Sequence, residues 1–208
     1  MIRKLLTFVL PIALAACASG PQEVTPAATG AAATAGAERP DIKVGDKWVF
    51  ACTYGFMKGD AVTVVTSVDQ AGIKATTNGE PVVMTPELNV LESPEQTSSD
   101  PRRLSFPLEV GKHWSVKQTY VWHEPNAKGS EKLDVSVVGY EKVHVRAGEF
   151  DAFKLKWTSQ WANDQHNSGT TDYTYWYAPA ARYLVKSELS RHWEPDRNCE
   201  LVEYQLQP

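Results

Sequence analysis

The sequence predicts an all-β domain, built as an antiparallel meander of about nine or ten strands. Short runs rich in Val, Thr, Tyr and Trp follow Pro40, turn residues separate them at regular intervals, and no helical period of three and four accompanies them. Such a meander buries its apolar face when it curls into a barrel, a half-barrel or a two-layer sheet. Curling also covers the edge strands, which otherwise pair with other chains.

Alternation within the runs indicates which side chains face inward. Trp48 and Phe50 alternate with smaller residues, and Phe153, Leu155 and Trp157 alternate with polar ones, so each strand has one apolar face. Turn residues bound the strands, which we expect at residues 61–68, 73–77, 113–122, 131–146, 150–161, 170–178, 182–193 and 199–206.

Glycines mark the expected bends. Asn78-Gly79 is typical of a two-residue type I′ hairpin turn, and Gly139 predicts a bulge within its long strand. The pattern Val44-Gly45-x-x-Trp48 recurs as Val110-Gly111-x-x-Trp114. A glycine bend that enters a strand whose first inward residue is tryptophan explains both copies.

We expect residues 41–208 to form a single β-rich domain. Within it, the stretch 85–103 contains Pro86, Pro94 and Pro101 and a Thr-Ser-Ser-Asp run, so it is predicted to be mostly loop.

A targeting segment precedes this domain. Arg3 and Lys4 give a basic start, and residues 5–13 form an apolar run too short to span a bilayer. Leu14-Ala15-Ala16-Cys17 follows and resembles the lipobox of bacterial lipoprotein precursors. The resemblance implies removal of a signal peptide at 1–16 and acylation of Cys17, with palmitate among the chains; the alternative is an ordinary secretory signal with an incidental cysteine.

Residues 17–40 are predicted to form a lipidated cysteine and a flexible linker, since Ala, Thr, Gly, Pro and Ser dominate them. The residues after Cys17 lack the aspartate associated with inner-membrane retention, so resemblance to lipoproteins of diderm bacteria implies the outer membrane, facing the periplasm. The acyl chains are the expected membrane contact. With 21 basic and 25 acidic residues, the net charge of -4 argues against a nucleic-acid partner.

Two cysteines remain once Cys17 is assigned to the lipid. Cys52 and Cys199 then form an even pair in an oxidising compartment, so we expect a disulfide between them. Two separate buried thiols are the alternative. A disulfide would place the first and last strands of the domain side by side.

The second half of the chain resembles a broad group of uncharacterised bacterial envelope proteins. The likeness covers roughly residues 105–190 and is carried by Pro107–Trp114, by Val138–Leu155 and by Trp176-Tyr177-Ala178-Pro179. It implies a β-rich extracytoplasmic domain without an established activity. Ala180–Tyr183 replaces the glycine-containing turn often seen after that proline, and the motif assigns no functional residue.

No catalytic or metal-binding pattern emerges from the sequence. The five histidines show no His-Glu-x-x-His spacing, and no Gly-x-Ser-x-Gly elbow is present. A chance meeting of His123-Glu124, His192–Glu194, Asp164 and His166 at one sheet end is the weak candidate for a metal site. We therefore expect no cofactor and no enzyme activity, with a hydrolase as the remote alternative.

Aromatic residues are the one suggestive feature for binding. They crowd successive predicted strands, where most fill the core and some line an apolar concavity. The candidate ligand-facing residues are Trp114, Tyr120, Trp122, Trp157, Trp161, Tyr173, Tyr175 and Tyr177.

Two functional hypotheses follow. The first is a non-catalytic envelope lipoprotein that acts as a binding or assembly module for an envelope protein. The second is a carrier of a lipid or another hydrophobic ligand in a barrel or half-barrel cavity. A continuous cavity near Trp157 and Tyr175 favours the carrier, and a filled interior with an exposed aromatic patch favours the module.

Overall fold

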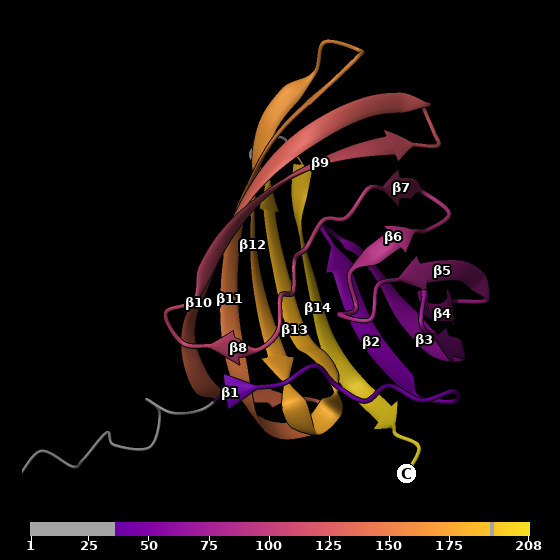
Figure 1. Cartoon of the computed structure of the whole chain (residues 1–208), viewed down its shortest axis with the longest axis vertical. Coiled ribbons are helices and arrows are strands. Elements are labelled where there is room, and N and C mark those ends of the chain that lie inside the picture. The colour runs from indigo at the N-terminus through magenta and orange to yellow at the C-terminus, as the bar shows by residue number, and fades with distance from the viewer. Residues whose placement is uncertain (1–35, 192–193) are drawn as a thin grey trace, which may run out of the picture. The chain divides into compact units, whose positions relative to one another are not determined.

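A computed structural model describes residues 36–191 and 194–208, and in them twelve antiparallel strands close into a barrel (Figure 1). The predicted all-β antiparallel fold is confirmed. Two further strands, β1 and β8, form a small sheet of their own. The strands are β1 (Gly36–Ala37), β2 (Lys47–Tyr54), β3 (Met57–Asp69), β4 (Gly72–Thr77), β5 (Glu80–Met84), β6 (Val90–Glu92), β7 (Gln96–Ser98), β8 (Leu108–Glu109), β9 (His113–Trp122), β10 (Ala127–Val145), β11 (Gly148–Asn163), β12 (Ser168–Ala178), β13 (Tyr183–Arg191) and β14 (Glu194–Gln205).

The barrel is a meander in which the first and last strands meet. Its order is β10-β11-β12-β13-β14-β2-β3-β4-β5-β6-β7-β9, and β9 pairs with β10 to close the ring. Cys52 on β2 lies opposite Cys199 on β14, with a Cα–Cα distance of 4.1 Å, and the two form a disulfide. The expected pairing of these two cysteines is thus confirmed.

Two short strands lie in the stretch that the prolines predict to be loop. β6 and β7, of three residues each, fall within residues 85–103 and link β5 to β9. They carry no alternating apolar pattern, so the sequence gives no strand signal there. Without β7, which pairs with β9 from Gln96 to Ser98, the barrel would be open.

The alternation of inward and outward side chains along each strand determines what fills the barrel. On β11 the side chains of Phe153, Leu155 and Trp157 are buried, as their spacing predicts. The same inward row continues with Ser159 and Trp161, so it changes from apolar to mixed along the strand. One end of the barrel interior is therefore a packed apolar core, and the other carries polar side chains.

The repeated glycine pattern corresponds to a repeated conformation. Gly45 and Gly111 both have φ of +91°, and each donates its backbone N–H to the neighbouring strand, to Val65 O of β3 and Val137 O of β10, both at 2.9 Å. The expected bends are confirmed. Each tryptophan that follows then donates its indole N–H to a distant carbonyl: Trp48 to Ala181 at 2.8 Å and Trp114 to Arg102 at 2.7 Å.

Two other expected backbone features are also present. Asn78 and Gly79 have φ of 53° and 86°, the positive values that a type I′ turn requires. The β10–β11 register shifts between Val137 and Gly139, which is the bulge expected near Gly139. Val138, the extra residue, points to solvent.

The described chain begins on the barrel. β1 lies within the segment 17–40 that composition assigns to the linker, yet Ala37 is buried and pairs with Leu108 of β8. The last residues of the predicted linker therefore belong to the packed part of the chain. The signal peptide, the lipobox with Cys17 and the rest of the linker lie outside the described residues. Among the described residues, no helix has the length and apolar character needed to cross a bilayer.

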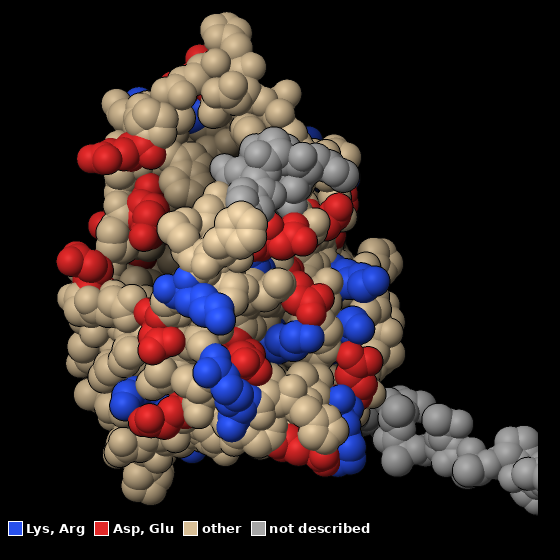
Figure 2. Space-filling view, turned by 180° about the vertical axis from the view of Figure 1, so that it is seen from behind, with Lys and Arg blue, Asp and Glu red and all other residues tan. Residues whose placement is uncertain are grey.

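The outer face of the barrel carries interleaved charges of both signs (Figure 2). Trp176 on β12 lies between Lys154 and Lys186, whose ammonium groups are 5.0 and 4.6 Å from its ring centroid. Its indole N–H donates to Glu141 at 2.7 Å, and this hydrogen bond, followed by the one from Lys154, lowers the pKa of that carboxyl. Cation–π contacts and a hydrogen bond to a carboxylate thus stabilise Trp176 on the outer face of the sheet.

Candidate functional site

A cavity of about 980 Å³ lies inside the barrel and opens to solvent at a rim that includes Met57, Lys58 and Asp60. Its walls come from strands on both sides of the ring, and the Cys52–Cys199 disulfide lies in its lining. Apolar and aromatic groups make up much of its surface, among them Val82, Met84, Tyr175, Leu184 and Leu189. Its volume is at the upper end of the range for small-molecule sites in proteins.

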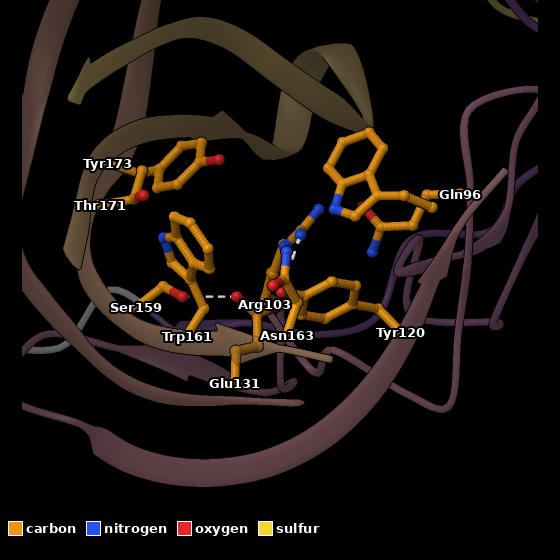
Figure 3. A pocket seen from close by; sticks show the side chains of 10 residues that line it. Gln96, Arg103, Tyr120, Glu131, Ser159, Trp161, Asn163, Thr171 and Tyr173 are labelled. Carbon is orange, nitrogen blue, oxygen red and sulfur yellow. Dashed lines mark hydrogen bonds and ion pairs between the residues drawn. The ribbon is translucent and has the colours of Figure 1, made fainter. Parts of the chain in front are cut away.

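A second cavity of about 200 Å³ adjoins the first (Figure 3). Four residues line both cavities, so the two are neighbours: Gln96, Arg103, Trp122 and Tyr173. The smaller cavity adds Tyr120, Glu131, Ser159, Trp161, Asn163 and Thr171. It is therefore the more polar of the two, whereas the larger one holds most of the apolar wall.

Glu131 is the only carboxylate in the described lining of the smaller cavity. It occupies an inward position on β10, on the same face of the strand as the core residues Leu133 and Val135. Gln118, its partner on β9, donates to one carboxylate oxygen, and the Ser159 hydroxyl on β11 donates to the other. Both oxygens of Glu131 are thus engaged, and the side chain has a fixed orientation.

Arg103 comes from the loop between β7 and β8, and hydrogen bonds hold this loop on both sides of it. The side-chain amide of Asn89, which is buried, donates to Leu104 O at 2.9 Å and accepts from Leu104 N at 2.8 Å. The Trp114 indole N–H donates to Arg102 O. Since the backbone is held at both neighbours, the Arg103 side chain is directed into the smaller cavity (Figure 3), and it also forms part of the lining of the larger one.

Stacked aromatic rings form the surface against which Arg103 lies. Trp157 and Tyr173 stack with ring centroids 3.5 Å apart and an interplanar angle of 13°. The Arg103 guanidinium carbon is 5.1 Å from the Trp157 ring centroid on this stack. Its terminal nitrogen is 3.9 Å from Glu131 Oε1, which is longer than a hydrogen bond.

Burial keeps three tyrosines in the lining of the cavities protonated at neutral pH: Tyr120, Tyr175 and Tyr183. Burial raises the pKa of Tyr175 well above its usual range, and burial also raises the pKa of Tyr183, to about 12. The pKa of Tyr120 is raised by burial first and then by the charges of Glu131 and Asp164. Their hydroxyls are therefore available as hydrogen-bond donors.

The eight aromatic residues predicted to face a ligand have different environments. Five line the cavities: Tyr120, Trp122, Trp161, Tyr173 and Tyr175. The other three do not line either of these cavities. Trp157 stacks against Tyr173, and Tyr177 packs edge-on against Phe106 in the core. The Trp114 indole N–H donates to the Arg102 carbonyl, and the Lys112 ammonium group lies over the Trp114 ring. Contact between a ligand and the five lining residues stays a prediction.

Sequence reasoning did not single out Arg103 and Glu131. Arg103 lies in a loop without periodicity, so nothing in the sequence indicates where its side chain points. The inward orientation of Glu131 could have been predicted, because it is two residues before Leu133 and four before Val135 and therefore lies on the same face of the strand. A carboxylate on an otherwise apolar face is an indication of an internal polar site.

The residues weighed for metal binding do not assemble in the described part of the chain. There, no group of three His, Cys, Asp or Glu side chains is placed to hold a metal ion. The His123 ring pairs instead with the Thr97 hydroxyl at 3.0 Å and with Pro94 O at 2.8 Å. His192 lies outside the described residues.

No protein-family model and no curated protein sequence matches this chain. Solved structures do match it. One is a protein from Bacteroides fragilis, proposed to be exported and described as having a YmcC-like fold, with a TM-score of 0.51 and 14% identity over 82% of this chain and 100% of that one. The chain shares the YmcC-like fold.

A second solved structure matches over nearly the same extent. It is a protein from Parabacteroides distasonis, proposed to be a lipoprotein, with a TM-score of 0.52 and 14% identity over 81% of this chain and 99% of that one. In both cases almost the whole of the other protein aligns with the barrel described above.

Proposed function

We propose that this protein is a lipid-anchored envelope protein whose barrel binds a hydrophobic small molecule. The observation that carries the proposal is the cavity of about 980 Å³ inside the barrel, with Tyr175, Leu184 and Leu189 in its wall. A domain whose only task is to present a surface gains nothing from such a space, because a filled interior is more stable. The carrier hypothesis is therefore favoured over the binding or assembly module.

Anchoring through acyl chains on Cys17 is the second part of the proposal. It is supported by the lipobox resemblance at Leu14-Ala15-Ala16-Cys17 and by the proposed export and lipoprotein nature of two proteins that share the fold. The lack of an aspartate after Cys17, together with the resemblance to lipoproteins of diderm bacteria, supports an outer-membrane location facing the periplasm. A barrel tethered beside a lipid surface is well placed to take up a hydrophobic ligand from it.

Native mass spectrometry of the full chain extracted from membranes tests the binding proposal. We expect a stoichiometric non-covalent lipid or other apolar ligand, in addition to the acyl chains on Cys17. Ala61→Trp, which fills the larger cavity from β3, should remove that ligand, whereas Lys117→Trp on the exposed side of β9 should retain it. A bare protein mass for the wild type, or equal ligand loss in both variants, contradicts the proposal.

A further inference from the structure

The charged group at the junction of the two cavities has unused hydrogen-bonding capacity. A guanidinium carries five N–H donors in a planar fork, yet Arg103 donates no hydrogen bond to any residue in the described part of the chain. Its Nε is buried without a partner, and its closest approach to a carboxylate is the 3.9 Å contact with Glu131. Buried polar atoms such as this Nε are almost always paired in folded proteins, so an acceptor from outside the described chain is indicated for it, while the Arg103 side chain as a whole is partly exposed, at 27%.

The carboxylate nearest to Arg103 is already engaged, and Gln118 Oε1, a buried acceptor on the residue beside Glu131, makes no hydrogen bond in the described part of the chain. Glu131 already accepts from Gln118 and Ser159 on its two oxygens. Burial raises the pKa of Tyr120, whose neutral hydroxyl can donate, and both Tyr120 and Tyr173 are in the lining with Arg103. A ligand group that is complementary to this site must therefore supply acceptor oxygens.

The charges of Arg103 and Glu131 favour a ligand head group with a single negative charge. A carboxylate accepts two parallel N–H bonds from one guanidinium, which is the strongest geometry available to Arg103. Glu131, with a side chain only one-tenth exposed, lies close enough to repel a second negative charge on the ligand. The same arginine lines the larger cavity together with Tyr173, Tyr175 and Leu189, which suits an apolar chain attached to the charged group.

We propose that Arg103 binds the carboxylate of a single-chain acidic amphiphile, whose head lies at the junction of the two cavities and whose tail lies in the larger one. This inference rests on the proposed function and names its ligand class. Trp157 and Tyr173 supply the stacked surface against which the planar guanidinium is held in place. The Asn89 and Trp114 hydrogen bonds to the loop position Arg103 before the ligand arrives.

Photolabelling of the full chain in its membrane tests this inference. Two probes are compared, a diazirine-bearing long-chain carboxylic acid and the alcohol of the same chain, and the labelled peptides are quantified by mass spectrometry. Wild type should be labelled within β12 and β13 by both probes and more strongly by the acid. Arg103→Gln should reduce the acid-to-alcohol labelling ratio by about tenfold while alcohol labelling persists, which also shows that the barrel is folded.

Three further variants sharpen the result. Arg102→Gln is the matched control, because Arg102 is exposed and pairs only with Asp100 at 3.7 Å, so the ratio should not change. Arg103→Lys should give an intermediate ratio, since an ammonium lacks the planar fork. Glu131→Gln removes the neighbouring negative charge and should raise the ratio.

The failures are distinguishable. If neither probe labels β12 or β13 in wild type, the proposed function itself is wrong. If both probes label these strands equally in wild type, or if Arg103→Gln keeps the preference for the acid, the cavity binds an apolar ligand but the acidic head group is wrong.

Discussion

The Asp46 carboxylate accepts a hydrogen bond from the backbone N–H of Gln207, 161 positions later in the chain, at 2.7 Å. Asp46 is fully buried, and it also accepts from Lys43 N at 3.0 Å and pairs with Arg182 at 3.4 Å. Arg182 follows the 3₁₀ turn at Pro179–Ala181, to whose last carbonyl Trp48 donates. One carboxylate thus joins the start of β2, the β12–β13 turn and the residues after β14.

Replacing Asp46 should destabilise the barrel strongly. Asp46→Ala leaves two backbone N–H groups and an arginine without their acceptor, which costs roughly 2–4 kcal/mol of unfolding free energy. Asp46→Asn keeps one acceptor oxygen and should cost less. Urea unfolding measures both. Asp41→Asn, at an exposed carboxylate paired only with Lys43, is the control and should change stability by less than about 0.5 kcal/mol.

The two glycine bends should respond differently to a methyl group. Gly45→Ala and Gly111→Ala both place a side chain at φ of +91°, which costs roughly 1–2 kcal/mol. At Gly45 the new Cβ also lies 3.3 Å from the Gln207 side chain, whereas at Gly111 it meets nothing within 4 Å. Gly45→Ala should therefore lower the melting temperature more than Gly111→Ala does; the opposite order would show that Gln207 moves aside freely.

Gly129 makes room for Tyr120 at the smaller cavity. A Cβ at position 129 would overlap with the Tyr120 ring and lie 2.6 Å from the Ala162 carbonyl oxygen. Gly129→Ala should displace the ring and cost roughly 1–3 kcal/mol through overpacking, as measured by thermal unfolding. Gly139→Ala, which meets nothing within 4 Å on the same strand, should be close to neutral. Equal losses at both positions would mean that strand conformation, and not Tyr120, is responsible.

Stability should fall at alkaline pH through the buried tyrosines. Because burial raises the pKa of Tyr183 to about 12, the neutral phenol is favoured in the folded state. Its stabilising contribution is complete below the unfolded pKa near 10 and is lost as pH rises through the folded pKa. Between pH 9 and 11 we expect a loss of up to about 1 kcal/mol from this residue, measured by urea unfolding.

Tyr183→Phe isolates this effect. Phenylalanine retains the ring that stacks on Trp48 at a centroid distance of 4.7 Å but cannot ionise. The variant should lose less stability than wild type between pH 9 and 11. An identical pH dependence in the two proteins would exclude Tyr183 as a source of the decline.

The sequence by itself determined most of the strands, though not short ones such as β6 and β7 or the start of β14, and it determined the bends and the disulfide partners. Alternation over Phe153, Leu155 and Trp157 gives the inward face because side chains on a strand point to opposite sides in turn. Gly45, Gly111 and Asn78-Gly79 give the bends because few other residues adopt positive φ. These are properties of a few neighbouring residues, so they can be predicted without knowing the rest of the fold.

Only the tertiary structure decided that the sheet closes and what it encloses. Closure depends on β7, a three-residue strand whose pairing with β9 is favoured by position and not by its own pattern. The cavity exists because inward residues on distant strands leave space between them, and Arg103 reaches it because Asn89 and Trp114 fix a loop from two other parts of the chain. Such contacts join residues far apart in sequence, and their strength depends on geometry that no local pattern records.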